Sequence, residues 1–297
     1  MKQVAMPLAA RDRLLDRFGV AAVAWIDDFG AIVSELCQKW ALIPRTVHAG
    51  GTGAVVECAS VTDGTRRALK LSPDRGITEQ EAAALRYWAD AHTVVNLMDA
   101  DTTHSAILLE WLPEATQLTA DTWVIAEVED LIADLFLPRT PPPPDVPLAR
   151  ERVEFVFELW DRRRRALPDS PIDDNVWRRS HAAALDMAGE GESVLHGDLH
   201  LGNLLRVGDG RGIVAIDPRP CIGDPAMDLT DLATIGAASE AEIRNRCRQL
   251  ADIAGPVDAD RLWLWCRTFA PLAAVSLARR TGKTEELTLM RDLAFTR

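Results

Sequence analysis

Apolar residues recur at helical spacing through the first forty positions of the chain. Within residues 8–40 the repeat comprises Leu14, Leu15, Phe18, Ile32, Val33, Leu36 and Trp40. Residues three and four apart share one face of a helix, so this spacing predicts helical structure with one buried side.

Short extended segments follow. Strands are predicted at residues 46–49, 54–61, 66–71 and 105–110. Asp63-Gly64 is typical of a tight hairpin turn, and Gly50-Gly-Thr-Gly53 joins the first two strands. Residues 78–90 are predicted to form a helix, which gives the order β-β-β-α-β.

The chain beyond residue 121 has mainly helical spacing. The predicted helices cover residues 121–137, 148–166, 173–189, 239–254 and 258–281. A hairpin at 204–217 interrupts them, with Gly208-Asp-Gly210 as its turn. The proline-rich segment 138–147 predicts a stiff exposed connection, because consecutive prolines do not fit helix or sheet hydrogen bonding.

The charge balance narrows the class of partner. The chain has 297 residues, 33 of them basic and 45 acidic, for a net charge of −12. A nucleic-acid-binding protein needs a basic face, so no nucleic-acid partner is expected. The acidic balance is compatible with a cationic ligand, although it is also common among proteins in general.

Hydropathy and cysteine usage suggest a cytoplasmic protein. No run approaches the ~18 apolar residues of a membrane span, so no membrane partner is expected. The five cysteines are scattered and no CxxC motif appears, which argues against a zinc site or a disulfide framework and fits a reducing compartment. The oligomeric state is left open.

The most specific chemistry lies at His196-Gly-Asp-Leu-His-Leu-Gly-Asn203 and in Ile216-Asp217-Pro218. Phosphoryl transfer to a hydroxyl needs one carboxylate near the hydroxyl, and an amide oxygen and a second carboxylate for Mg²⁺. Folding of the 204–217 hairpin would bring Asn203 and Asp217 together. The spacing therefore predicts a kinase-like site rather than an ordinary polar loop.

These residues resemble the kinase-like phosphotransferases that modify small molecules. The glycine between His196 and Asp198, and Asp217-Pro-Arg219, are similar to the antibiotic and choline kinases. The run 215–229 resembles more narrowly the family of aminoglycoside, streptomycin 6- and hydroxyurea phosphotransferases. The resemblance extends over about residues 45–235.

The resemblance implies an α+β, bilobal, protein-kinase-like fold. A small antiparallel β-sheet lobe with its N-terminal helical segment, residues 1–111, would bind the nucleotide. A larger, mainly helical lobe, residues 112–297, would carry catalysis and the acceptor site.

The resemblance also assigns roles within the larger lobe. Asp198 would act as the catalytic base, and Asn203 and Asp217 would bind Mg²⁺. His196 would orient the catalytic loop, and Asp228 is expected to anchor the following helix and support that loop.

In the smaller lobe the resemblance implies ATP as the donor. Lys70 would contact its phosphates and be held by Glu81, with Glu79 as the competing glutamate. Lysine suits this task as a compact point charge.

Two further small-lobe segments are assigned to the nucleotide. Gly51 and Gly53 belong to a loop expected to lie close over the phosphates, since glycine permits close backbone approach. The backbone at Glu110 and Leu112 would contact adenine, while Trp111 is expected to pack.

The acceptor site is the least defined feature. The candidates for lining it, each equally acceptable as a surface or core residue, are Glu127, Asp130, Asp134, Trp263 and Trp265. The expected acceptor is a cationic small molecule of the aminoglycoside type, streptomycin first. The alternatives are a kinase for hydroxyurea or another small alcohol, and a non-catalytic nucleotide-binding pseudokinase. Zinc ligation by His196 and His200 and serine hydrolysis are disfavoured, because neither a third ligand nor a nucleophile motif appears.

Overall fold

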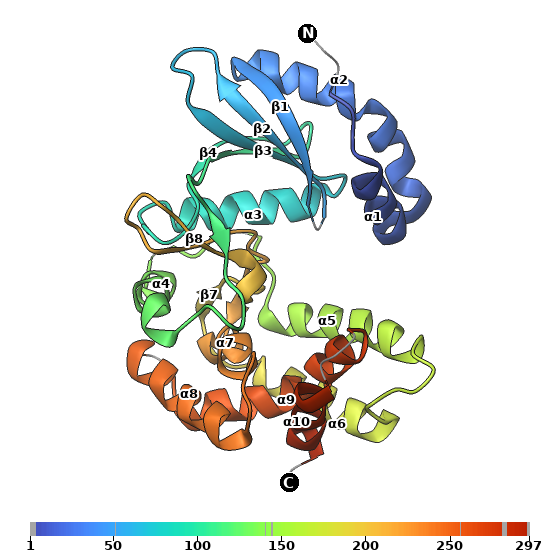
Figure 1. Ribbon diagram of the computed structural model, residues 1–297, viewed down its shortest axis with the longest axis vertical. Helices are drawn as coiled ribbons and strands as arrows, with labels where there is room; N and C mark the ends of the chain where they lie inside the picture. Colours follow the sequence, from blue (N-terminus) through green and yellow to red (C-terminus); the bar gives the residue numbers. More distant parts are fainter. Residues whose placement is uncertain are drawn as a thin grey trace. The chain divides into compact units, whose positions relative to one another are not determined.

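The computed structural model describes residues 4–50, 52–139, 141–143, 145–255, 257–280 and 284–295. The chain folds into two compact units, one made of Met1–Ala89 and Val95–Pro113 and the other of Asp90–Val94 and Glu114–Arg297 (Figure 1). The division expected after residue 111 stays a prediction, and nothing in the sequence pattern indicated the excursion of Asp90–Val94. No helix among the described residues combines the length and apolar character needed to cross a bilayer.

The first unit begins with helical structure. Helix α1 spans Leu8–Phe18, a 3-10 turn η1 spans Gly19–Ala22, and α2 spans Val23–Lys39. The apolar repeat over residues 8–40 therefore predicted the right structure.

A five-stranded antiparallel sheet follows in the order β1-β2-β3-β5-β4. The strands are β1 Leu42–Ala49, β2 Ala54–Ser60, β3 Arg66–Leu71, β4 Leu97–Asp101 and β5 Ala106–Glu110. The predicted order β-β-β-α-β was wrong in omitting β4. This edge strand exposes Met98 and Asp99 and lacks an apolar alternation that a sequence pattern would show.

The sheet of the first unit separates two helices (Figure 1). On one face, Phe29, Val33 and Leu36 of α2 pack in one core cluster with Leu69 and Leu71 of β3. Successive strand residues point to opposite faces, so Lys70 between these two leucines points to the other face. That face is covered by α3, Arg75–Tyr87.

The second unit contains two small sheets and most of the helices. Its strands are β6 Thr116–Gln117, β7 Ser193–Leu195, β8 Leu204–Arg206, β9 Ile213–Ala215 and β10 Cys221–Gly223. Its helices are α4 Glu129–Phe136, α5 Ala149–Arg165, α6 Asp174–Met187, α7 Thr230–Thr234, α8 Glu240–Ile253, α9 Ala259–Ala278 and α10 Thr284–Phe295. Short 3-10 turns lie at η2 Ile125–Val128, η3 Leu201–Asn203 and η4 Pro225–Met227. Helix α9 contacts α5, α6, α7, α8 and α10, and so forms the centre of the helical part.

Two expectations for this unit need correction. The helix predicted over residues 121–137 begins as a 3-10 turn at Ile125 and is α-helical only over Glu129–Phe136. A turn precedes it, because Thr122 Oγ1 accepts a hydrogen bond from the backbone N–H of Thr119 at 3.2 Å. Helices α7 and α10, and the short strands β6, β7 and β10, were not predicted.

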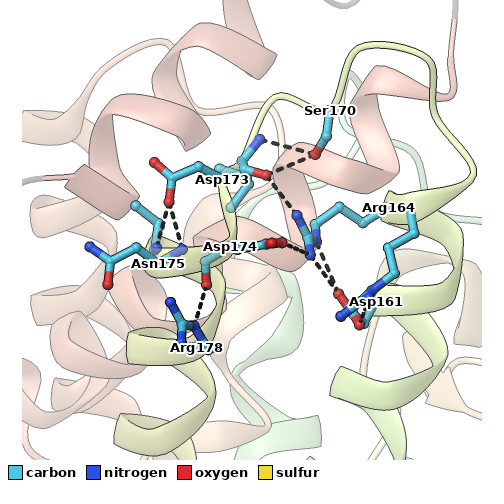
Figure 2. Close-up of polar contacts among 10 residues, drawn as sticks. Asp161, Arg164, Ser170, Asp173, Asp174, Asn175 and Arg178 are labelled. Atoms are coloured by element: carbon cyan, nitrogen blue, oxygen red, sulfur yellow. Dashed lines mark hydrogen bonds and ion pairs between the residues drawn. The ribbon is translucent and has the colours of Figure 1, made fainter.

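The arginine-rich end of α5 builds the turn into α6 (Figure 2). The guanidinium of Arg164, which is 5% exposed, donates to Asp161 at 2.8 Å, to Asp174 at 2.5 Å and to the carbonyl of Ile172 at 3.1 Å. Asp173 caps α6 by accepting from two backbone N–H groups. Arg164 is therefore a structural residue that joins two helices.

Candidate active site

The loop from His196 to Asn203 follows β7, which pairs antiparallel with β10. Gly197 has a φ of +73°, and a Cβ placed on it would lie 1.9 Å from the carbonyl oxygen of Arg219. Any side chain would strain the backbone and collide with that carbonyl, so this position requires glycine.

His196 ties this loop to the segment that follows β9 and leads to Asp217. Its ring is fully buried, and Nε2 donates to the carbonyl oxygen of Ile216 at 3.0 Å. Burial lowers the pKa of His196 to about 4, so the imidazole is neutral at physiological pH and holds the two segments together.

Asp228, which lies between η4 and α7 in the chain, fixes the same loop. Its carboxylate accepts hydrogen bonds from the backbone N–H of His196 at 2.5 Å and of Gly197 at 2.8 Å. Burial raises the pKa of Asp228 to about 7, although these two hydrogen bonds and the charge of Arg152 favour the ionised form. The predicted support of the catalytic loop thus has a specific geometry.

Asp198 presents its carboxylate at the edge of this loop, with 36% of the side chain exposed. Nδ2 of Asn203 donates to the carbonyl of Asp198 at 2.9 Å and lies 3.4 Å from Oδ2. Arg152 of α5 donates to Oδ1 at 3.0 Å. Sequence analysis missed Arg152, since it lies far upstream in an arginine-rich helix and no spacing links it to the loop.

The hairpin β8–β9 brings the ends of the two motifs together. Leu204 pairs with Ala215, and the N–H of Ile216 donates to the carbonyl of Asn203 at 2.9 Å. Asp217 is the next residue, and it adopts a left-handed conformation with φ of +58°, which aspartate tolerates better than most residues.

The oxygen donors here fit Mg²⁺. Because Nδ2 of Asn203 donates to Asp198, the carboxamide oxygen Oδ1 points to the other side of the amide, and Asp217 supplies a second side chain with oxygen ligands. Mg²⁺ in proteins typically takes one or two such oxygens and completes its shell with phosphates and water. Within the described part of the chain no group of three His, Cys, Asp or Glu side chains offers an alternative metal site.

In the first unit, Lys70 and Glu81 form a buried ion pair. Nζ of Lys70 lies 2.7 Å from Oε1 and 2.6 Å from Oε2 of Glu81, and the side chains are 7% and 1% exposed. Glu79 instead pairs with Arg75 on the surface of α3. Of the two glutamates weighed from the sequence, Glu81 is therefore the one that reaches the lysine.

The glycine loop of this unit is only partly described. Gly51 lies outside the described residues. A Cβ on Gly53 would lie 1.8 Å from the carbonyl of Leu71, so packing against β3 already requires glycine there. A role of these glycines in binding phosphates stays a prediction.

The strand end expected to contact adenine is well ordered by local bonds. The carboxylate of Glu110 accepts from the backbone and side chain of Asn96 at 2.8 and 3.0 Å, and Leu112 is buried. The ring of Trp111 lies 5.3 Å from the guanidinium carbon of Arg66, which fits its expected packing role. The contact of residues 110 and 112 with adenine stays a prediction.

The two candidate tryptophans for the acceptor site belong to the core. Trp265 is fully buried, and its Nε1 donates to Asp224 at 2.7 Å. Trp263 is 8% exposed and lies against the guanidinium of Arg244 at 3.9 Å.

Two of the three candidate carboxylates also have structural partners. Glu127 accepts from Arg206 at 2.8 Å, and Asp134 accepts from the N–H and hydroxyl of Thr93 at 3.2 and 2.9 Å. Asp130 is exposed on α4. The acceptor candidates from the sequence are therefore mostly explained by packing.

Comparisons with solved structures identify the fold. The chain is similar to choline kinase LicA from Streptococcus pneumoniae, with a TM-score of 0.61 and 12% identity, covering 89% of this chain and 97% of that one. It is also similar to a thermostable mutant of aminoglycoside phosphotransferase APH(4)-Ia, with a TM-score of 0.52 and 15% identity over 88% and 96% of the two chains. The predicted α+β, bilobal, protein-kinase-like fold is confirmed.

Comparisons with known sequences identify the family. Streptomycin 6-kinase from Streptomyces glaucescens is 34% identical over 76% of this chain and 73% of its own length. Hydroxyurea phosphotransferase from Kitasatospora aureofaciens is 29% identical over 83% and 72%. The model of the aminoglycoside/hydroxyurea antibiotic resistance kinases matches residues 39–282. The chain therefore belongs to the aminoglycoside/hydroxyurea antibiotic resistance kinase family, as its motifs indicated.

Proposed function

We propose that this protein is a cytoplasmic kinase that transfers the γ-phosphoryl group of ATP, with Mg²⁺, to a hydroxyl of a cationic small molecule. The observation that carries the proposal is the placement of Asp198, Asn203 and Asp217 by one loop and one hairpin. This arrangement occurs in a chain whose family consists of kinases.

Asp198 is the general base in this proposal. As the acceptor oxygen bonds to phosphorus, its O–H bond breaks and the proton passes to the carboxylate, while the bond from phosphorus to the ADP oxygen breaks. Asp228 and His196 keep the loop in place during this step. Asp228 accepts hydrogen bonds from the loop backbone, and the ring of His196 donates to the carbonyl of Ile216.

The remaining polar groups hold the donor. When bound, Mg²⁺ neutralises charge on the phosphates, and Asn203 and Asp217 supply its oxygen ligands. Lys70 contacts the phosphates, and Glu81 fixes the direction of its ammonium. The loop that contains Gly51 and Gly53, and the backbone at Glu110 and Leu112, are the other groups of the first unit that we expect to contact ATP.

Streptomycin is the first candidate acceptor. Two relatives, from Streptomyces glaucescens and Streptomyces griseus, are streptomycin 6-kinases at 34% and 32% identity. The net charge of −12 favours approach of a cation. Hydroxyurea is the second candidate, because the hydroxyurea phosphotransferase relative matches over 83% of this chain.

Mass spectrometry of the acceptor tests the proposal. Streptomycin incubated with the protein, ATP and Mg²⁺ should gain one phosphate. Hydroxyurea and choline are run in parallel. Phosphorylation of hydroxyurea alone would reject streptomycin but leave the kinase mechanism in place, and no phosphorylation of any compound would contradict the proposal.

Calorimetry of ATP binding tests the metal ligands separately. ATP should bind the wild-type protein more tightly with Mg²⁺ than without it, and Asp217→Ala should remove most of that difference. An unchanged Mg²⁺ dependence in Asp217→Ala would show that Asp217 is not a ligand.

A further inference from the structure

Arg152 reaches the catalytic loop from a helix that the sequence motif does not include. Its Nε donates to the carbonyl of Gly197 at 2.9 Å, and its Nη2 donates to Oδ1 of Asp198 at 3.0 Å. One planar guanidinium thus holds two consecutive residues, the carbonyl before the proposed base and the base itself.

The fold fixes Arg152 relative to this loop. Helix α5 starts beside β10, where Leu148 forms a bridge with Ile222. The approach is so close that a Cβ on Gly223 would lie 2.4 Å from Cβ of Ala149. Since β10 pairs with β7, which leads directly into the loop, the first turn of α5 and the loop belong to one rigid arrangement.

The Arg152 contact differs from an ordinary surface ion pair. Its side chain is 16% exposed, whereas most surface pairs hold two mobile, solvated groups. Burial raises the pKa of Asp228, and the guanidinium lies close enough to this carboxyl to oppose that rise. The backbone of Gly197 is therefore held on both sides, because its N–H donates to Asp228 and its carbonyl accepts from Arg152.

This arrangement distinguishes the two oxygens of Asp198. Oδ1 accepts from Arg152, while among the described residues Oδ2 has longer contacts, 3.4 Å to Nδ2 of Asn203 and 3.8 Å to Nε2 of His200. The guanidinium therefore occupies one carboxylate oxygen and leaves the other side of the carboxylate for the acceptor hydroxyl.

We propose that Arg152 is a positioning residue, which fixes Oδ1 of Asp198 and the Gly197 carbonyl so that Oδ2 faces the acceptor hydroxyl. The inference rests on the proposed function, since it assumes that Asp198 is the base. Arg152 exchanges no proton and contacts no substrate. It acts only through the orientation of Asp198.

The test compares Arg152→Ala with a control on the same helix, Arg150→Ala. Arg150 donates to the carbonyl of Leu185 and does not contact the loop. Turnover is measured with streptomycin, or with hydroxyurea if that compound is the one phosphorylated. If neither compound is phosphorylated, turnover is measured as slow ATP hydrolysis.

Arg152→Ala should lower kcat by about 10- to 100-fold, the scale expected for a misplaced reacting group. The KM for ATP should change less than about threefold, because the nucleotide contacts are unchanged. Guanidinium chloride at millimolar concentration should restore part of the lost turnover, and it should not stimulate Arg150→Ala or Asp198→Asn. A merely structural role would not give this rescue.

Arg152→Lys covers the case in which Arg152→Ala does not fold. Its single nitrogen restores the charge but cannot donate in a fork, so kcat should be intermediate with the KM for ATP retained. Wild-type kcat in either variant, or an equal loss of kcat and ATP affinity, would overturn the inference. Near-normal turnover of Asp198→Asn would instead overturn the proposed function, so the two failures are distinguishable.

Discussion

The buried pair of Lys70 and Glu81 gives a prediction in which stability and activity separate. Both oxygens of Glu81 lie within 2.7 Å of the lysine nitrogen, and neither side chain is more than 7% exposed. Removing one partner of a buried ion pair typically costs about 3–5 kcal/mol, because the other charge stays in a poorly solvated site. We therefore expect Glu81→Leu, and likewise Lys70→Met, to lower the free energy of unfolding by that amount.

The double variant Lys70→Met/Glu81→Leu should behave differently. It removes both charges and places apolar side chains between β3 and α3, a change that is often neutral or stabilising in proteins. Most of the lost stability should return, which corresponds to a coupling energy of about 2 kcal/mol or more. Turnover should stay low in all three variants. Lys70→Met and the double variant have no ammonium for the phosphates, and in Glu81→Leu the ammonium of Lys70 has lost the carboxylate that directs it.

Urea denaturation followed by circular dichroism measures the stabilities, and calorimetry measures ATP binding. Arg75→Met is the matched control, since Arg75 is 65% exposed and pairs with the exposed Glu79 at 2.8 Å. It should cost at most about 1 kcal/mol and leave turnover unchanged. A loss below about 1 kcal/mol for Glu81→Leu, or strictly additive losses in the double variant, would refute this account of the pair.

Three further variants test individual features of the second unit. Asp228→Asn should lower turnover, because a carboxamide offers one acceptor oxygen to two N–H groups. Burial raises the pKa of Asp228 to about 7, so its favourable contribution to stability is present below the unfolded pKa near 3.8 and is lost as pH rises through 7. In urea titrations, wild type should therefore lose stability relative to the variant between pH 5 and pH 8. A pH-independent difference would contradict the burial argument. In thermal melts Gly197→Ala should be more destabilising than Gly64→Ala. Gly64 has nearly the same φ, +71°, but open space around it, whereas a Cβ on Gly197 would collide with the carbonyl of Arg219. Equal losses would show that this carbonyl moves freely. Arg164→Met should lower the free energy of unfolding by about 1–3 kcal/mol with an unchanged KM for ATP, because the buried carbonyl of Ile172 loses its hydrogen-bond donor; an unchanged free energy of unfolding would show that water replaces the guanidinium.

The sequence motif predicted local geometry well where the polar residues of the site are close to one another along the chain. The turn of the 204–217 hairpin brings Asn203 next to the residue before Asp217, as its glycines and short apolar runs indicated. Helices α5, α6 and α8 were found within two residues of their predicted ends, because their apolar faces repeat at the helical period.

Other features had no local signal. Strand β4 is defined by pairing with β5 and carries exposed residues, so its pattern looked like a loop. Trp263 and Trp265 were acceptable as acceptor contacts from their residue type alone. Only the packing of α9 at the centre of the helical part shows that they are core residues.

By itself the sequence determined the family and the fold class, because these depend on residue types at fixed short spacings, and it predicted the residues of the proposed catalytic loop. The tertiary structure decided which partners those residues have. It selected Glu81 rather than Glu79 for Lys70, and it brought Arg152 and Asp228 to the loop from opposite sides in sequence. The reason is physical: burial and contacts between distant segments follow from how helices and strands pack, and this packing leaves no periodic trace along the chain.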